Sequence, residues 1–407
     1  MKITYIHQYF HTPAVPGSIR SYEMARRFVA WGHEVDLITS DRNPQPGQTG
    51  WRTTDEAGIR VHWLPVPYSN SLSAPERIRA FFKFAIGAAR KAAELDADLV
   101  FATSTPLTIA LPAVYAARRK GVPMVFEVRD LWPELPIAIG ALRGGLSIAS
   151  AQWLERFAYR NAARVVALSP GMKAGVVRTG YPEERVHVIP NSADIELFNV
   201  PAEAGAAFRA RHAWLGDRPL VVYVGTMGEI NGVSYLAELA AKVRPEAPEV
   251  RFLVVGGGRE EEKVRARARE LGVLGDNFHM LPKVPKAEVP GILSAATFAT
   301  SLFIDLKEMW HNSANKFFDG LASGTPMLIN YGGWQAEMLQ ETGAGLVLPP
   351  NDLDEAKTRL LRALADGAWL ERAGKRAFEL AETRFSRDLL ARDLMGVLER
   401  AHAEHRP

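Results

Sequence analysis

Residues 315–330 read Asn-Lys-Phe-Phe-Asp-Gly-Leu-Ala-Ser-Gly-Thr-Pro-Met-Leu-Ile-Asn, and this stretch predicts a helix that leads directly into a strand. The Ser323-Gly324 pair is a typical helix end, and an apolar run follows the Thr-Pro step. Lys316 and Asp319 are three residues apart and share one face of the helix. A cation near the free N–H groups of a helix start suits a phosphate, and a carboxylate one turn on suits a sugar diol. The stretch therefore predicts a nucleotide-sugar site.

The rest of the chain repeats this alternation of strand and helix, which is typical of parallel sheets with crossover helices. Strands are expected at 2–6, 34–39, 59–64, 98–102, 123–128, 164–168 and 186–189, then at 219–225, 250–255, 277–281, 297–303, 326–330 and 345–348. Helices of the first half are expected at 18–31, 75–94, 106–120, 150–162 and 170–180. The poorly periodic stretch 191–217 indicates a linker.

We therefore expect an α/β protein with two Rossmann-like, doubly wound parallel-sheet domains that face each other across a cleft. The first domain is expected to span residues 1–195 and the second residues 196–385. An amphipathic helix over 386–407 is expected to pack back on the first domain.

Composition limits the class of protein. With 407 residues, 47% of them hydrophobic and 23% charged, the chain is globular and long enough for two cores. It has no cysteine, which excludes disulfides and favours a reducing compartment. The N-terminus lacks the apolar core of a signal peptide, so we expect a cytoplasmic protein and not a periplasmic binding protein. The uncharged stretch 99–117 is broken by Pro106 and Pro112, which argues against a membrane span.

Three glycine-rich turns are expected at strand ends, where backbone can approach a ligand. The first contains Gly17 and Ser18, the second runs over 225–232, and the third is Gly256-Gly257-Gly258. Each is also compatible with an ordinary tight turn, and Ser18 with a helix N-cap.

The stretch 127–134, Glu-Val-Arg-Asp-Leu-Trp-Pro-Glu, leaves a predicted strand at its carboxyl end. Arg129, Asp130 and Trp132 are suited to an anion and a sugar ring, although a buried ion pair that closes the loop is the alternative. Asp96-Ala97-Asp98 resembles a metal-binding pattern but precedes its strand, so no metal is expected. Neither a P-loop nor a G-x-S-x-G elbow is present.

The predicted helix 75–94 is basic on one side. Five basic residues and no acidic one lie between Arg77 and Lys91. The expected buried stripe is Ile78, Phe81, Phe82, Ala85 and Ala92, with Arg79, Lys83 and Arg90 roughly opposite. Such a face suits anionic lipid, and a solvated face over an ordinary core stripe is the alternative. One basic helix without a motif does not indicate nucleic-acid binding.

Taken together, these motifs resemble those of the retaining family-4 glycosyltransferases of the GT-B fold, in particular the bacterial branch that builds O-antigen, capsule or exopolysaccharide. The resemblance covers nearly the whole chain. It rests on residues 5–10 with Gly17, 20–25, 32–35 and Thr39, on 128–134, on 188–194 with Phe198, and on 315–326 with Gly332, Gly333 and Glu337.

The resemblance implies transfer of a hexose or N-acetylhexosamine-type sugar from a UDP-sugar, without metal or other cofactor. It implies donor-binding roles for Gly17, Gly225, Thr226, Asn231, Gly256, Asn315, Lys316, Asp319, Gly333 and Glu337, and catalytic roles for Arg129, Asp130 and Lys316. It implies acceptor contacts from Ser18, Arg20 and Trp132, with an undecaprenyl-diphosphate-linked saccharide as acceptor and peripheral attachment to the inner leaflet through helix 75–94.

The chain departs from the family at three places. Thr226 and Asn231 stand where an arginine and a lysine usually bind the diphosphate, which moves that task to Lys316 and Arg129. Asp319 replaces the second of two glutamates. His311 replaces the first, so that either His311 or Glu308 is left to hold the donor sugar. A UDP-sugar 2-epimerase of similar fold and a non-enzymatic sugar-binding protein are the alternative functions.

Overall fold

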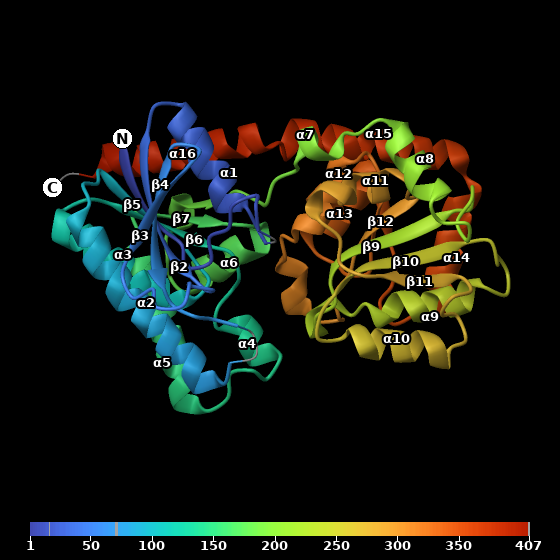
Figure 1. Cartoon of the computed structure of the whole chain (residues 1–407), viewed down its shortest axis with the longest axis horizontal. Coiled ribbons are helices and arrows are strands. Elements are labelled where there is room, and N and C mark those ends of the chain that lie inside the picture. Colours follow the sequence, from blue (N-terminus) through green and yellow to red (C-terminus); the bar gives the residue numbers. More distant parts are fainter. Residues whose placement is uncertain (16, 70–71, 406–407) are drawn as a thin grey trace. The chain divides into compact units, whose positions relative to one another are not determined.

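The computed structural model describes residues 1–15, 17–69 and 72–405, so Pro16 of the first glycine turn lies outside the described residues (Figure 1). The chain forms two compact units. The N-terminal unit is Met1–Pro190 together with the C-terminal segment that begins at Arg387, and the C-terminal unit is Asn191–Ser386.

A single sheet organises the N-terminal unit, with strand order β3-β4-β2-β1-β5-β6-β7-β8. Its strands are β1 (Lys2–Ile6), β2 (Glu34–Asp41), β3 (Arg52–Glu56), β4 (Ile59–Pro65), β5 (Leu99–Thr103), β6 (Met124–Val128), β7 (Arg164–Ala167) and β8 (Val186–Val188). Its helices are α1 (Arg20–Ala30), α2 (Ala74–Glu94), α3 (Ala110–Lys120), α4 (Glu134–Ala138), α5 (Gly145–Arg160), α6 (Pro170–Arg178) and α16 (Arg387–Glu404), with 3-10 turns η1 (Leu107–Ile109) and η2 (Glu183–Arg185). All the ladders are parallel except that between β3 and β4.

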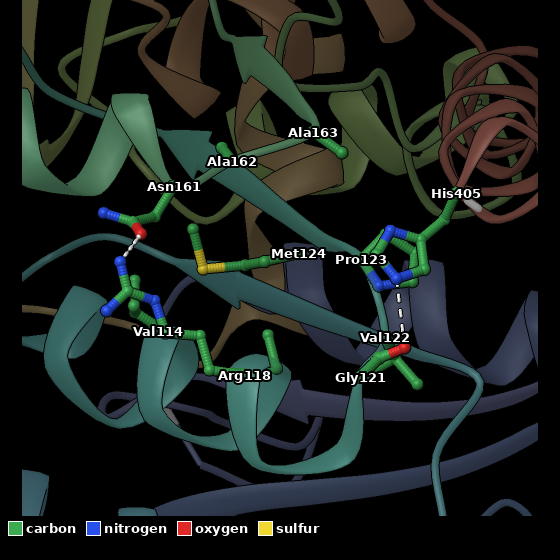
Figure 2. Close-up of a pocket in the computed structure, with 11 residues that line it drawn as sticks. Val114, Arg118, Gly121, Val122, Pro123, Met124, Asn161, Ala162, Ala163 and His405 are labelled. Carbon is green, nitrogen blue, oxygen red and sulfur yellow. Dashed lines mark hydrogen bonds between the residues drawn. The ribbon is translucent and has the colours of Figure 1, made fainter. Parts of the chain in front are cut away.

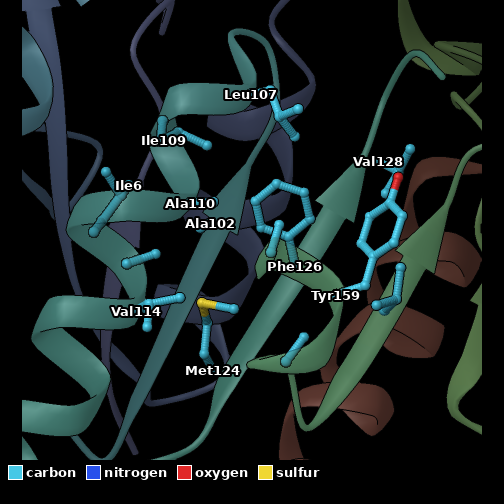
Figure 3. Close-up of a cluster of buried hydrophobic side chains, with 14 of the residues drawn as sticks. Ile6, Ala102, Leu107, Ile109, Ala110, Val114, Met124, Phe126, Val128 and Tyr159 are labelled. Carbon is cyan, nitrogen blue, oxygen red and sulfur yellow. The ribbon is translucent and has the colours of Figure 1, made fainter. Parts of the chain in front are cut away.

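The two faces of this sheet carry separate cores. On one face, Ile6, Ala102 and Phe126 pack with residues of α2, α3 and α5, as Figure 3 shows for the part around Val114 and Tyr159. On the other face, Tyr5 and Phe101 pack with α1 and with Leu390, Leu394 and Leu398 of α16. Helices α1 and α16 lie side by side there (Figure 1). The C-terminal helix thus completes the core of the N-terminal unit.

The C-terminal unit contains a parallel sheet of order β11-β10-β9-β12-β13-β14. Its strands are β9 (Leu220–Thr226), β10 (Arg251–Gly257), β11 (Phe278–Leu281), β12 (Phe298–Ser301), β13 (Met327–Ile329) and β14 (Gly345–Val347). Its helices are α7 (Ile195–Phe198), α8 (Ala202–Ala210), α9 (Ser234–Val243), α10 (Glu261–Glu270), α11 (Val289–Ser294), α12 (Asn315–Ala322), α13 (Trp334–Thr342), α14 (Leu353–Ala365) and α15 (Gly367–Arg384), with η3 (Glu229–Asn231), η4 (Lys286–Glu288) and η5 (Lys307–His311). The predicted class, a pair of parallel α/β sheets, is confirmed. The stretch 191–217, expected as a linker, contains α7 and α8.

The buried stripe of helix α2 was predicted in part, since Ala85 and Ala92 are buried as expected. Ala80, Phe84, Ala88 and Ala92 form its buried stripe, whereas Ile78 and Phe82 are exposed. The prediction was wrong at these two positions because the helix carries apolar residues on more than one face. Its buried residues recur at every fourth position from Ala80 to Ala92, and this stripe packs against α3.

The turn that ends β10 depends on the absence of a side chain. Gly256 pairs with Gly225 in the β9–β10 ladder, and a Cβ atom on Gly256 would lie 1.9 Å from the Gly225 carbonyl oxygen. Its φ of +151° also disfavours an L side chain.

We expect Gly256→Ala to lower the free energy of unfolding by about 3 kcal/mol, because backbone has to move to admit the methyl group. Gly367→Ala is the matched control, since a Cβ there meets nothing within 4 Å. Urea unfolding measures both. Equal stability of the two variants would contradict the close packing of the β9 and β10 ends.

Candidate active site

Lys316 lies in the first turn of α12 and extends over the end of β9. Its Nζ donates a hydrogen bond of 2.9 Å to the Tyr223 hydroxyl and lies 4.6 Å from the centroid of that ring and 5.7 Å from that of Phe303. Among the described residues, no carboxylate forms an ion pair with Lys316. Burial lowers the pKa of Lys316 to about 8. A half-buried ammonium group without a counter-charge is a candidate binding group for an anion.

The turn after β9 leaves room for this lysine. A Cβ atom on Gly225 would lie 3.4 Å from the Lys316 Cε and 3.6 Å from the Tyr223 hydroxyl. That hydroxyl donates in turn to the Thr226 carbonyl at 2.7 Å. Tyr223 therefore connects the lysine to the glycine turn, and sequence reasoning missed it. The available signal was a polar-tipped aromatic residue two positions before the turn glycine.

Two backbone amides expected to cradle a diphosphate are already engaged. The Met227 N–H donates to the Gly257 carbonyl at 3.0 Å, and the Gly228 N–H donates to Asn231 Oδ1 at 3.2 Å. Asn231 therefore closes its own turn, and Gly256 supports the backbone of Gly225. The donor contacts of both residues stay predictions, and Lys316 supplies a positive charge beside this turn.

Asp319 has surroundings different from those of Lys316. Its carboxylate lies 3.8 Å from Lys286 Nζ, and that ammonium group lies 5.4 Å from the centroid of the Phe198 ring. The expected pair on one helix face is thus divided, with Lys316 turned to Tyr223 and Asp319 close to Lys286.

The remaining donor positions of the C-terminal unit surround the ends of α12 and α13. Asn315 and Glu337 are exposed in the first turns of these helices. Gly333 is held against Trp310, because a Cβ there would lie 2.6 Å from the Trp310 carbonyl oxygen. His311 and Glu308 both lie on η5.

In the N-terminal unit, Gly17, Ser18 and Arg129 come together. Arg129 donates to the Ser18 hydroxyl at 2.8 Å, and its backbone N–H donates to the Ser104 hydroxyl at 3.1 Å. Helix α1 begins at Arg20 without a side-chain cap, so the alternative reading of Ser18 as an N-cap is wrong. Asp130 is exposed, and the partly buried Trp132 packs against the core below.

Arg20 makes contacts that correct its predicted role. It is only 5% exposed and forms an ion pair with Glu127, with N···O distances of 3.0 and 2.8 Å. It also donates to the carbonyls of Ile189 and Pro190 at the end of the unit. These four bonds occupy the guanidinium group internally, so Arg20 does not project toward an acceptor. The buried ion pair is therefore that of Glu127 with Arg20, whereas Arg129 and Asp130 form no ion pair within the described residues.

The described residues contain no group of three His, Cys, Asp or Glu side chains arranged to hold a metal ion. A pocket of about 320 Å³ lies elsewhere, at the amino ends of β6 and β7 (Figure 2). Arg118 donates to Asn161 at 2.6 Å beside it, and His405 lies 3.0 Å from the Gly121 carbonyl oxygen. None of the predicted site residues lines this pocket, which is at the opposite edge of the sheet from Arg129.

We expect Arg20→Met to lower the free energy of unfolding by about 3–5 kcal/mol, because it leaves the Glu127 carboxylate buried without a partner. The double variant with Glu127→Gln should recover part of this loss. Arg26→Met, on the exposed side of the same helix, is the control and should cost under about 1 kcal/mol. Denaturant unfolding measures all three. Unchanged stability of Arg20→Met with loss of acceptor binding would restore the predicted ligand role.

Comparison with known proteins places both units in families. A model described as a glycosyl transferase 4-like domain matches residues 17–192, and one described as glycosyl transferases group 1 matches residues 206–380. The chain is 29% identical over 257 residues to alpha-maltose-1-phosphate synthase of Mycolicibacterium smegmatis, covering 60% of this chain and 63% of that protein. It is 24% identical over 272 residues to the putative colanic acid biosynthesis glycosyl transferase WcaI of Escherichia coli, covering 64% and 66%. The chain thus spans slightly less than two thirds of the length of these relatives.

Solved structures share the fold at low identity. Sucrose-phosphate synthase from Thermosynechococcus elongatus matches with a TM-score of 0.80 at 18% identity, covering 99% of each chain. Anabaena Alr3699/HepE in complex with UDP and glucose matches with a TM-score of 0.73 at 16% identity, covering 98% of this chain and 100% of that one. With a family model on each unit and this fold throughout, the chain belongs to the family-4 glycosyltransferases of the GT-B fold.

Proposed function

We propose that the protein transfers a hexose or N-acetylhexosamine-type sugar from a UDP-sugar to an acceptor hydroxyl, with retention of configuration. The observation that carries this proposal is Lys316, an ammonium group beside the Gly225 turn that no carboxylate of the described residues neutralises. A nucleotide diphosphate supplies the missing negative charge. The HepE complexes contain UDP, which supports UDP as the nucleotide, whereas some relatives are named as GDP-mannose-dependent.

The proposed roles divide between the two units. In the C-terminal unit, Lys316 stabilises the diphosphate as the bond between the sugar C1 and the phosphate oxygen breaks, and Asp319 accepts hydrogen bonds from the ribose hydroxyls. Lys286 Nζ lies 3.8 Å from the Asp319 carboxylate and can orient it for this role. Gly333 and Glu337 are proposed to bind the same UDP-sugar donor.

In the N-terminal unit, Arg129 and Asp130 orient the transferred sugar or the acceptor. The binding site for this group is bordered by Gly17, Ser18 and Trp132. The hydrogen bond from Arg129 to Ser18 fixes the guanidinium group toward the glycine turn. The acceptor hydroxyl forms the new bond to C1 on the face the diphosphate leaves, and the leaving phosphate takes the hydroxyl proton. These reaction steps require no side chain to act as a base. They are the mechanism that the family resemblance implies.

We further propose that the acceptor is a lipid-linked saccharide of surface polysaccharide synthesis and that α2 attaches the protein to the inner leaflet. Ile78, Phe82 and Ile86 are 54%, 47% and 55% exposed and recur at every fourth position, which makes one apolar ridge. Arg79, Lys83 and Arg90 are exposed on the same helix. Apolar side chains flanked by cations suit the interface of an anionic membrane. No helix in the described part of the chain has the length and apolarity needed to cross a bilayer.

We expect Lys316→Met to reduce UDP release in the presence of donor and acceptor by about 10²–10³-fold, the usual cost of losing one group that stabilises developing charge. Lys242→Met, which removes a surface lysine paired with Asp354 at 2.9 Å, is the control and should retain activity. A Lys316→Met turnover within about threefold of wild type would disprove the role of this lysine. A thermal-shift panel of UDP, GDP, ADP and their sugars, run on both variants, identifies the nucleotide.

We expect replacement of Ile78, Phe82 and Ile86 by serine to abolish flotation with vesicles that contain phosphatidylglycerol, because the apolar contact with the acyl chains is lost. Ser replacement of Tyr115, an exposed residue on α3, is the control. Turnover with a water-soluble acceptor should stay unchanged in the triple variant. The membrane proposal would be wrong if the wild-type protein does not float with the vesicles, or if the triple variant floats equally well.

A further inference from the structure

A group of basic side chains in the N-terminal unit lies at the carboxyl ends of adjacent strands. His11 follows β1, Arg42 follows β2, and Arg129 follows β6. In the sheet order β2-β1-β5-β6, these ends belong to one edge, which is where ligands of such sheets bind. His11 and Arg42 have no role in the function proposed above.

Direct contacts connect Arg42 with His11 and His11 with Gly17, and Arg129 is bonded to Ser18, the residue after Gly17. The Arg42 guanidinium donates to His11 Nε2 and lies 5.8 Å from the centroid of the Tyr9 ring. The His11 ring packs on Gly17, where a Cβ atom would come within 2.7 Å of it. Burial and then the charge of Arg42 lower the pKa of His11, and Arg129 acts in the same direction. His11 is therefore uncharged when it accepts the Arg42 hydrogen bond, and it lies within electrostatic range of both guanidinium groups.

The positive charge of this group is not balanced nearby. Within the described ranges, neither Arg42 nor Arg129 forms an ion pair. Asp41, the residue before Arg42, pairs instead with Arg52 at 3.6 Å, and Glu127 pairs with Arg20. Asp130, the residue after Arg129, interacts electrostatically with its guanidinium group but does not come within ion-pair distance of it. The same strand end also holds Gln8, which is 1% exposed and whose amide oxygen and nitrogen lack a partner within the described chain.

Aromatic rings connect this group to α2. The Tyr9 ring centroid lies 5.2 Å from that of Tyr68, and Tyr68 stacks on Phe81 of α2 at 5.8 Å. The Tyr68 N–H also donates to the Arg42 carbonyl at 3.3 Å. Two aromatic rings, those of Tyr9 and Tyr68, thus connect the Arg42 guanidinium to Phe81 of α2, and the next residue, Phe82, belongs to the exposed apolar ridge.

We propose that Arg42, His11 and Arg129 form a second anion site, which binds the diphosphate of the lipid-linked acceptor. This rests on the proposed function, since it assigns the acceptor side of the same reaction. A diphosphate has enough charge to neutralise both guanidinium groups, and arginine binds phosphate oxygens in a bidentate manner. Because this site is connected to α2, it suits a head group whose lipid tail remains in the membrane. The donor diphosphate is bound separately, by Lys316 in the other unit.

The test is a calorimetric titration of the full chain with inorganic pyrophosphate in the presence of saturating UDP, which blocks the donor site. We expect one remaining binding event, and Arg42→Gln should weaken it by about tenfold because a charged donor is lost. Arg52→Gln is the matched control, because Arg52 lies on β3 and pairs with Asp41, and it should change the affinity by less than about twofold. The affinity for UDP should be the same in all three proteins.

Absence of pyrophosphate binding beside UDP, or equal binding by Arg42→Gln and wild type, would overturn the proposal. If thermal unfolding shows that Arg42→Gln does not fold, His11→Phe tests the same site, because it removes the acceptor that orients Arg42. Farnesyl diphosphate and inorganic phosphate form a second pair of titrants. Binding of farnesyl diphosphate that depends on Arg42 and exceeds that of phosphate supports an acceptor site, and equal binding of the two contradicts it.

The outcome is separable from that of the proposed function. If UDP does not bind to the wild-type protein, the donor proposal fails. Titration of Lys316→Met with pyrophosphate still measures binding at the Arg42 site alone. If UDP binds and sugar is transferred while Arg42 has no effect on pyrophosphate, only the second site is refuted.

Discussion

The Lys316 ammonium group, held on the Tyr223 hydroxyl without a carboxylate partner in the described chain, is the interaction on which the donor side of this protein depends. A half-buried charge without a counter-charge is costly, and this cost appears as the lowered pKa of the lysine. The hydroxyl and two aromatic rings offset part of it. The surrounding backbone is shaped to admit the long side chain, because Gly225 leaves space beside Cε and Gly256 lets the neighbouring strand end pass closely. An arriving diphosphate removes the electrostatic cost, so the site is built for an anion before one binds.

The presence or absence of a carboxylate partner also distinguishes three arginines of the N-terminal unit. Arg20 is neutralised by Glu127 and bonded to two backbone carbonyls, so it acts as a fixed part of the fold at the end of the unit. Arg42 and Arg129 contact neutral partners, His11 and Ser18, and keep their charge available. The residue type is the same in the three cases. What differs is whether a carboxylate lies opposite, and that follows from the tertiary arrangement.

Much of the architecture could be predicted from the sequence, because apolar strands such as β5 and β6 stand out between amphipathic helices. Strand β3 could not, since Arg52–Glu56 is a polar edge strand without an apolar pattern. The buried face of α2 was predicted only at Ala85 and Ala92, because periodicity alone does not decide between two apolar stripes. At the site, Lys316 and Arg129 were found by type and position at helix and strand ends. Their partners Tyr223 and Ser18 come from elements about a hundred residues away in the chain, which no local pattern specifies.

The most direct measurement of the central claim is the titration of the Lys316 side chain by NMR of the protein with 13C at the lysine ε-carbon, assigned with Lys316→Met. We expect a pKa of about 8 for Lys316 in the free protein, which rises toward the ordinary lysine value of about 10.4 when UDP binds, because the diphosphate stabilises the charged form. A Lys316 pKa that is already ordinary in the free protein, or that stays the same when UDP is bound, would contradict it.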